Sequence, residues 1–253
     1  MNILFIGKGL VAKKCLVKLY ENDLGNYICG ILGDNGMINL ALKNKLDSRL
    51  IKEVSIVERN EKFIEELIAI GKPDLIFSIQ YPWIISSSII KKMDGEIYNL
   101  HNAKLPEYRG HNTISHEILN EEKFHYSTIH KIDKNIDMGI ICAEDKILIN
   151  SEYSAHDLWL SSHKICIKIF IEFIQILTQG KNFDIHRKIL KRGRYYGKKE
   201  INNLKQIKDF NDKKEIFLKS KAFYFPPHEP AYIVLDNLKI YMSFKYNSKS
   251  YNK

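Results

Sequence analysis

The first 120 residues alternate between short apolar runs and segments whose apolar residues recur at helical spacing. The apolar runs have the length of strands and occupy residues 2–7, 27–32, 74–79 and 96–101. The helical patterns occupy residues 10–22, 60–71 and 84–93. Strands that alternate with helices predict an α/β fold with a mostly parallel sheet covered on both faces. Ligands then bind beyond the carboxyl ends of the strands.

The pattern changes after residue 121. Two strand-like runs, residues 124–133 and 139–149, are separated by a short connection and predict a hairpin. A long helical pattern follows them. Ser154 is suited to cap its first turn and Gly180 to end it.

The last part of the chain predicts a small, β-rich end. A helical pattern over residues 204–223 precedes a proline-rich segment and two strands on either side of Asp236 and Asn237. We therefore divide the chain into an α/β domain, residues 1–180, and a small C-terminal β-hairpin module, residues 181–253.

Charge is distributed unevenly between these two parts. The net charge of the chain is +9. Residues 1–180 hold 21 basic and 23 acidic residues, whereas residues 181–253 hold 18 basic and 7 acidic ones. This asymmetry suggests an anionic partner for the C-terminal part, either a nucleotide, an RNA or a membrane surface. A lysine-rich surface of no special function is the alternative.

The cysteines and the longest apolar runs indicate a cytoplasmic protein. The four cysteines lie far apart without a Cys-x-x-Cys pair, which suits reduced thiols and predicts neither a zinc site nor a disulfide framework. The apolar start of the chain reads as a first strand rather than a signal peptide. No apolar run approaches the ~18 residues of a membrane-spanning helix.

Three polar side chains are candidates for one catalytic site. Asn99 and His101 are two apart at a strand end, so they project to one face, and Asp137 lies in a turn that Gly139 could sharpen. The amide could stabilise an oxyanion, the imidazole could take a proton from an attacking amine, and the carboxylate could support the imidazolium. His130, whose strand leads to Asp137, is a supporting candidate. Each residue also has an ordinary explanation as a loop, sheet-edge or turn residue.

Two separated motifs resemble signatures of the formyltransferase family. Residues 99–110, NLHNAKLPEYRG, resemble its Asn-x-His followed by a Ser-Leu-Leu-Pro-x-Tyr-Arg-Gly loop. Residues 102–104, Asn-Ala-Lys, depart from the usual small-residue and leucine run, which we expect to affect the packing of the loop and not the chemistry. Residues 127–142, STIHKIDKNIDMGIIC, resemble its Thr-x-His strand and Asp-x-Gly-x-Ile turn. The resemblance covers residues 1 to about 150 and implies a Rossmann-like formyltransferase catalytic domain. It implies 10-formyltetrahydrofolate as the formyl donor, no metal, and a catalytic set made of Asn99, His101 and Asp137.

The loop after the strand at residues 74–79 is the predicted donor site. It combines aromatic and aliphatic side chains that could line a pterin, with backbone groups for its hydrogen-bonding edge. The alternative is a helix start with ordinary core packing. In family members the matching loop borders the folate, so the resemblance implies donor contacts from Gln80, Tyr81, Pro82, Trp83, Ile84 and Ile85.

The acceptor is suggested by residues 221–242, KAFYFPPHEPAYIVLDNLKIYM. This segment resembles an Arg-Ala-Phe-x-Phe-Pro-Pro segment and hairpin of sugar N-formyltransferases. The resemblance implies a nucleotide-linked, commonly dTDP-linked, amino-dideoxy sugar, of the 4-amino-4,6-dideoxyglucose type. Such sugars serve surface polysaccharides such as the O-antigen of lipopolysaccharide. The residues expected to contact this substrate are Tyr108, Arg109, Gly110, Phe223 and Phe225.

Several alternatives remain open at this stage. Arg109 could bind pyrophosphate as a guanidinium fork, or it could fix its loop by donating to backbone carbonyls. The chain could instead formylate methionyl-tRNA, or be a non-catalytic module that binds an anionic partner. We expect a small-molecule acceptor, no nucleic acid or membrane partner, and a homodimer formed through the terminal hairpin.

Overall fold

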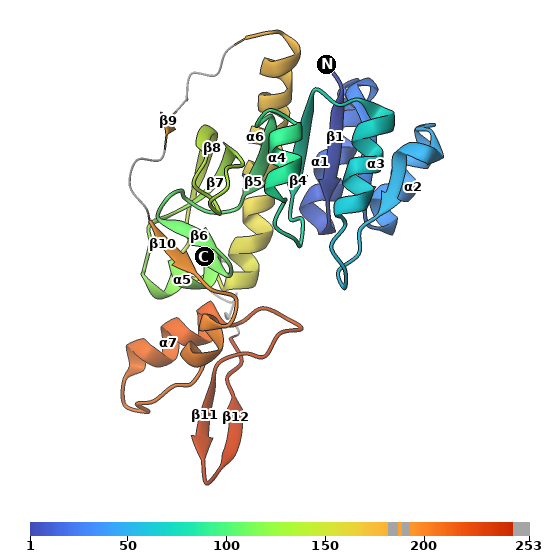
Figure 1. The fold of residues 1–253 in the computed structure, drawn as a ribbon. Helices are drawn as coiled ribbons and strands as arrows, with labels where there is room; N and C mark the ends of the chain where they lie inside the picture. Colours follow the sequence, from blue (N-terminus) through green and yellow to red (C-terminus); the bar gives the residue numbers. More distant parts are fainter. Residues whose placement is uncertain (182–186, 189–192, 245–253) are drawn as a thin grey trace.

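The computed structural model describes residues 1–181, 187–188 and 193–244 (Figure 1). Within these residues the main sheet has the strand order β3-β2-β1-β4-β5-β7-β8-β9. The strands are β1 (Ile3–Gly7), β2 (Ile28–Gly33), β3 (Ile51–Glu53), β4 (Leu75–Ile79), β5 (Ile97–His101), β7 (Phe124–Lys131), β8 (Ile140–Leu148) and β9 (Arg187–Lys188). The first five in sequence are parallel, and β7, β8 and β9 continue the sheet antiparallel. The predicted mostly parallel α/β fold is confirmed.

Helices cover both faces of this sheet, as its apolar strands require. The alternation of side chains along β1 sends Ile3 and Phe5 to one face and Leu4 and Ile6 to the other. The first face packs against α1 (Gly9–Glu21), α2 (Asn35–Lys43) and α6 (Ala155–Thr178). The second face packs against α3 (Glu61–Gly71) and α4 (Ser87–Lys92).

The long helix α6 begins and ends where its sequence predicts. Ser154 accepts a hydrogen bond from the Asp157 N–H at 3.2 Å, and Asp157 accepts one from the Ser154 N–H at 3.0 Å, which completes a capping box. Gly180, with φ +66°, follows the last turn. None of the described helices is both long and apolar enough to cross a membrane.

The rest of the described chain packs below the sheet (Figure 1). Residues 108–110 of β6 (Tyr108–Gly110) pair in parallel with β10 (Arg194–Tyr196). The helices α5 (Thr113–Leu119) and α7 (Lys213–Ala222) share an apolar cluster with the first turns of α6, built from Ile114, Ile118, Ala155, Leu158, Ala222 and Phe223 among others. The C-terminal part therefore packs against helices of the main domain.

The helix predicted over residues 204–223 is wrong in its first half. Asp212 caps α7 by accepting from the backbone N–H groups of Lys214 and Glu215, so the helix starts only at residue 213. The preceding segment pairs with the terminal hairpin instead, where the Ile207 N–H donates to the Tyr232 carbonyl at 2.8 Å. A long-range pairing has overridden the local helical pattern.

The terminal hairpin has the two strands predicted for it. It consists of β11 (Tyr232–Leu235) and β12 (Leu238–Tyr241), joined at Asp236 and Asn237. Both turn residues have positive φ, 47° and 66°, which is the geometry of a two-residue hairpin turn that Asp and Asn tolerate. The hairpin projects away from the rest of the molecule (Figure 1).

Candidate active site

Asn99 and His101 lie at the carboxyl end of β5, where the sheet changes direction. β5 pairs in parallel with β4 and antiparallel with β7. The two side chains are two residues apart and project to one face. His130 of β7 is directly opposite Asn99, and its Nε2 lies 3.2 Å from Asn99 Nδ2.

Asp137 reaches the same place from the connection between β7 and β8. Its Oδ2 accepts a hydrogen bond from the Gly110 N–H at 2.9 Å and lies 3.9 Å from His101 Nδ1. Its Oδ1 lies 3.5 Å from His130 Nε2. The structure therefore brings together the three side chains predicted as catalytic and places His130, the supporting candidate, beside them.

The turn is built differently from the expectation. Asp137 itself has the positive φ of 52°, so it adopts the left-handed conformation that Gly139 was expected to supply. Gly139 is required for another reason. A Cβ at this position would overlap the carbonyl group of Lys131 on the neighbouring strand. The missing side chain lets the turn lie close enough to β7 for the Asp137 carboxylate to meet the histidines.

The Asp137 carboxylate is strongly stabilised in its charged form. Burial alone favours the protonated acid, but the His101 and His130 imidazoles and the Gly110 N–H favour the anion and hold the pKa of Asp137 well below its ordinary value. The Asp137 and His101 side chains are each only 11% exposed, so water screens their interaction weakly. A full negative charge therefore faces His101 at any pH near neutrality.

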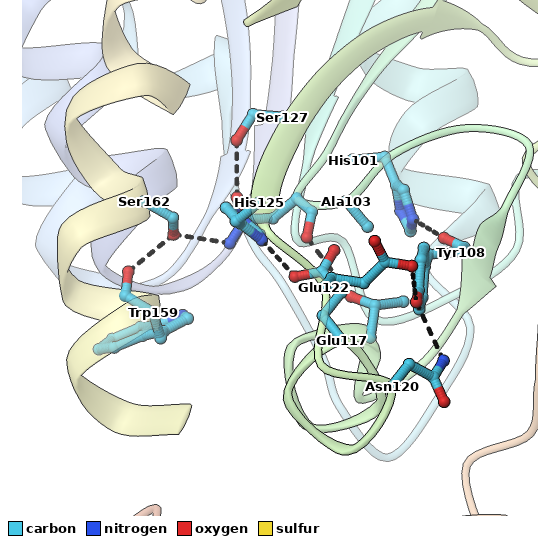
Figure 2. A network of polar contacts seen from close by, with 12 residues as sticks. His101, Ala103, Tyr108, Glu117, Asn120, Glu122, His125, Ser127, Trp159 and Ser162 are labelled. Carbon is cyan, nitrogen blue, oxygen red and sulfur yellow. Dashed lines mark hydrogen bonds and ion pairs between the residues drawn. The ribbon is translucent and has the colours of Figure 1, made fainter. Parts of the chain in front are cut away.

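The backbone determines which nitrogen of His101 can act as a base. Nε2 lies 2.7 Å from the carbonyl oxygen of Tyr108, so Nε2–H donates to that carbonyl (Figure 2). In the neutral ring the lone pair is then on Nδ1, the atom that faces Asp137. A proton accepted on Nδ1 would produce an imidazolium directly beside the carboxylate.

The predicted donor loop, residues 80–85, follows β4 and therefore starts beside the end of β5. Gln80 has a φ of +53°, which turns the chain sharply at the strand end. Trp83 is fixed by its Nε1–H, which donates to the Ser55 carbonyl at 2.9 Å. Ile85 is buried in the core, whereas Ile84 is 67% exposed. The residues present fit a pterin, because the loop combines an exposed aliphatic side chain, Ile84, with the half-buried rings of Tyr81 and Trp83.

The Arg109 guanidinium does not face solvent, as it would have to in order to bind the pyrophosphate of a substrate. Its guanidinium donates to the carbonyls of Ile136 at 3.1 Å and Gly193 at 3.3 Å, and the residue is 3% exposed. The contacts instead match the second possibility, that Arg109 fixes its loop by donating to backbone carbonyls. Arg109 thereby joins the 108–110 segment to the turn that carries Asp137.

We expect Arg109→Met to destabilise the fold and leave substrate affinity intact. The variant leaves two carbonyls without their charged donor, which should lower the free energy of unfolding by about 2–3 kcal/mol. The KM for the acceptor should stay within about twofold, since a guanidinium that is buried and donates to carbonyls of its own chain is not presented to a ligand. Urea unfolding and steady-state kinetics measure the two quantities. Arg49→Met, at an exposed pair with Asp47, is the matched control and should change neither. A large rise in KM at unchanged stability would return Arg109 to the substrate site.

Tyr108 and Gly110 also have internal partners in place of the expected substrate contacts. Tyr108 is buried, and its hydroxyl donates to Glu122 Oε1 at 2.7 Å while its carbonyl accepts from His101. The Gly110 N–H donates to Asp137. Both residues therefore hold candidate catalytic side chains, His101 and Asp137, in place.

The two phenylalanines predicted for the substrate site both pack in the apolar cluster under α5 and α6, Phe223 buried and Phe225 half-buried. Phe223 is 3% exposed and belongs to the apolar cluster under α5 and α6, which removes it from a substrate surface. Phe225 is half-buried and packs edge-on against Trp159, with ring centroids 5.4 Å apart. The proline-rich segment was expected to supply aromatic contacts because of its sequence, but its rings complete a core.

A second polar cluster, which was not predicted, lies behind β5, the strand that carries Asn99 and His101. His125 of β7 and Glu117 of α5 are fully buried, with Nδ1 and Oε2 only 2.6 Å apart. Alternation along β7 places His125 on the face opposite His130. Nothing in the local sequence indicates that Glu117 is buried or that it meets His125. Within the described part of the chain, no group of three or more His, Cys, Asp or Glu side chains is arranged to hold a metal ion.

Comparison with known proteins identifies the family. The family model described as formyl transferase matches residues 1–174. The GDP-perosamine N-formyltransferase of Brucella melitensis is 26% identical over 236 residues, which are 93% of this chain and 84% of that protein. The methionyl-tRNA formyltransferase of Finegoldia magna is also 26% identical, over 164 residues that cover 62% of this chain and 53% of that protein.

Solved structures share the fold over nearly the whole chain. The N-formyltransferase from Helicobacter canadensis, solved with folinic acid and dTDP-3-aminofucose, has a TM-score of 0.72 at 20% identity and covers 95% of this chain and 86% of that chain. The resemblance inferred from the two signatures is thus confirmed. Since the family model spans both signatures and most of the described sheet, the chain belongs to the formyl transferase family.

Proposed function

We propose that the protein transfers a formyl group from 10-formyltetrahydrofolate to the amino group of a nucleotide-linked amino-dideoxy sugar. The observation that carries the proposal is the convergence of Asn99, His101 and Asp137 at the end of β5. An amide donor, a base and a buried carboxylate are the groups that acyl transfer to an amine requires. The bound donor would supply the formyl carbon, held by residues 80–85.

The residues act in a definite order. His101 Nδ1 takes the proton that the sugar amine loses as it attacks the formyl carbon, since Nε2–H is already bonded to the Tyr108 carbonyl. Asn99 Nδ2–H donates to the formyl oxygen, where negative charge develops. Asp137 stabilises the imidazolium that results. The bond between the formyl carbon and the folate nitrogen that carries it would then break, and the imidazolium would return its proton to that nitrogen, so that tetrahydrofolate leaves and His101 is neutral again.

His130 Nδ1 lies 3.0 Å from the Lys131 carbonyl oxygen, so Nδ1–H donates to it and the lone pair of the neutral ring is on Nε2. His130 Nε2 therefore accepts the other N–H of Asn99 and keeps the amide nitrogen directed to the reaction.

A sugar acceptor is favoured over a tRNA by the extent of the two sequence similarities. The GDP-perosamine enzyme matches 93% of the chain, whereas the methionyl-tRNA enzyme matches 62%. The additional match includes the C-terminal third, the part expected to recognise the acceptor. We propose dTDP as the nucleotide and a 4-amino-4,6-dideoxyglucose as the sugar, for surface polysaccharide synthesis in the cytoplasm. GDP is the other nucleotide that the comparisons name.

The deciding experiment supplies 10-formyltetrahydrofolate and a panel of amino sugars linked to dTDP, GDP and UDP. We expect one of them to gain a single formyl group by mass spectrometry, at the sugar nitrogen. His101→Ala should abolish the gain, whereas a non-catalytic module would keep its binding. Formylation of methionyl-tRNA, with no amino sugar modified, would contradict the proposed acceptor.

We also propose that the hairpin β11–β12 mediates a homodimer. Strand β12 exposes three large apolar residues, Leu238 at 69%, Ile240 at 46% and Tyr241 at 52%. A projecting two-stranded ribbon of this kind is unstable alone in water and is usually covered. A second copy of the same hairpin could cover it through a symmetric contact.

Two lysine substitutions on β12 test this dimer. We expect L238K/I240K to convert a dimer into a monomer in sedimentation experiments, because four charges would meet in the contact. The matched control is L42K/I70K, which changes two exposed apolar residues of α2 and α3 and should leave the dimer intact. A wild-type monomer would contradict the proposal.

A further inference from the structure

The strongest unexplained feature is a buried polar network directly behind the catalytic loop. It extends from Trp159 and Ser162 on α6 to His125 on β7 and Glu117 on α5, and lies beside the contact between His101 and Tyr108 (Figure 2). Glu117 is 1% exposed and His125 is fully buried. Because a buried ion pair rarely increases stability, its presence suggests a requirement for position instead.

Asn102, the residue next to His101, is the centre of this network. Its Nδ2–H donates to Ser162 Oγ at 2.8 Å. Its Oδ1 is surrounded by three donors, His125 Nε2 at 3.0 Å, Ser127 Oγ at 2.7 Å and Cys166 Sγ at 3.1 Å. Contacts from two elements, β7 and α6, therefore hold one amide on the catalytic loop.

The orientation of the Asn102 amide follows from the chemistry of its partners. The Ser162 hydroxyl has one proton, and donates it to the Trp159 carbonyl at 2.7 Å. Ser162 must therefore accept from Asn102, which requires the amide nitrogen on that side. The amide oxygen then faces His125, so His125 Nε2 must carry a proton.

The same reasoning places a second proton between His125 and Glu117. His125 Nε2–H is committed to Asn102, so the 2.6 Å contact between Nδ1 and Glu117 Oε2 needs a proton on one of these two atoms. In either position the pair has no net charge, which suits its complete burial. Burial raises the pKa of Glu117, although the neighbouring His125 opposes the shift.

The loop is held at both ends, next to His101. At its start the Thr128 hydroxyl donates to the Ala103 carbonyl at 2.8 Å, beside the Asn102 contacts. At its end Tyr108 is held by Glu122 through its hydroxyl and accepts the His101 Nε2–H on its carbonyl. A shift of Asn102 would therefore move the base relative to Asp137 and the substrate.

We propose that Asn102, His125 and Glu117 are positioning residues of the formyl-transfer site. The hydrogen bond between His125 and Glu117 fixes the tautomer of His125. This tautomer fixes the orientation of the Asn102 amide. The Asn102 amide in turn holds the neighbouring His101 in its catalytic position. This inference rests on the proposed function, since it concerns the turnover of that reaction. This positioning role requires a hydrogen-bonding side chain at position 117, but it does not require that side chain to be charged.

Two variants of Glu117 test that requirement. In Glu117→Gln the amide can donate to His125 Nδ1, which keeps Nε2–H on Asn102, so kcat should stay within about fivefold of wild type. In Glu117→Met the His125 ring has no partner at Nδ1 and can carry its proton there. The lone pair on His125 Nε2 then faces the Asn102 Oδ1 oxygen and repels it. We expect kcat to fall roughly ten- to a hundredfold, with both KM values within about twofold, because a small displacement of a catalytic group acts mainly on the chemical step.

Two serines of the same helix provide a matched pair that does not change a charge. Ser162→Ala removes the partner of Asn102 Nδ2 and should lower kcat by about three- to tenfold at unchanged KM. Ser154→Ala removes the cap of α6 and should lower Tm without lowering kcat. This pair decides the question if Glu117→Met fails to fold.

The outcomes separate this inference from the proposed function. If the wild-type protein formylates none of the amino sugars, the proposed acceptor fails; kcat of the variants is then compared on methionyl-tRNA. The positioning role is overturned if folded Glu117→Met and Ser162→Ala both keep wild-type kcat. It is also overturned if kcat follows Tm in all four variants, since that result describes a purely structural network.

Discussion

Asn99→Ala is expected to lower kcat for formyl transfer by about 10²–10³-fold, the usual loss when one oxyanion donor is removed. The effect should fall on kcat, because the amide matters most when negative charge develops on the formyl oxygen. The KM for the donor should change little. The position of His130 supports this assignment, since it accepts one N–H of Asn99 and leaves the other for the substrate.

The control for this experiment is another asparagine whose amide is bonded. Asn44 ends α2 and donates to the Leu40 carbonyl at 2.8 Å, on an element that does not reach the end of β5. Asn44→Ala should keep wild-type kcat with a small loss of stability. Single-turnover measurements separate the chemical step from product release. An Asn99→Ala enzyme with near-normal single-turnover rate would exclude Asn99 as the oxyanion donor.

The sheet and the catalytic strand could be predicted because their signals are local. Apolar runs of strand length fixed β1, β4 and β5, and the spacing of Asn99 and His101 placed both side chains on one face. Ser154 and Gly180 bounded α6 because capping depends on neighbouring residues only. The same kind of signal failed at residues 204–212, where pairing with the distant residue Tyr232 prevailed.

The predicted substrate contacts stay predictions, because whether a side chain faces a ligand depends on its burial, which a sequence motif does not give. A motif shows that Tyr108 and Arg109 matter, but it cannot show whether their side chains face a ligand or the protein. The structure gives both residues partners within the protein, at carbonyls and a carboxylate from other elements. Glu117 and His125 escaped prediction for a related reason, since they come together only when α5 packs on β7.

Asp137→Asn is the second large effect, expected at about 10²–10³-fold in the maximal kcat. Asparagine keeps the shape of the side chain and can still accept from the Gly110 N–H, but it removes the charge beside His101. The imidazolium formed during transfer then loses its partner, as in catalytic triads whose carboxylate is replaced. Circular dichroism and Tm must first show that the turn at Asp137 is intact.

The pH–rate profile gives a second and sharper measurement. The pKa of Asp137 is held below its ordinary value, so the wild-type carboxylate is charged throughout an assay between about pH 5 and 9 and does not itself titrate there. A neutral His101 is required to accept the amine proton, so activity should rise with pH on the acidic limb. Without the anion the imidazolium is less favoured, and the acidic limb of Asp137→Asn should move to lower pH.

Two other histidines, His130 and His111, also interact with the Asp137 carboxylate, so their effects on the pH–rate profile must be distinguished from that of His101. His130 lies 3.5 Å from Asp137 Oδ1. The pKa of His111 is lowered by burial and by Lys198, while Asp137 opposes that shift. His111→Gln should therefore leave the acidic limb in place. If a folded Asp137→Asn enzyme also keeps its acidic limb, the limb does not report a base beside Asp137, and the substrate amine becomes the group that titrates.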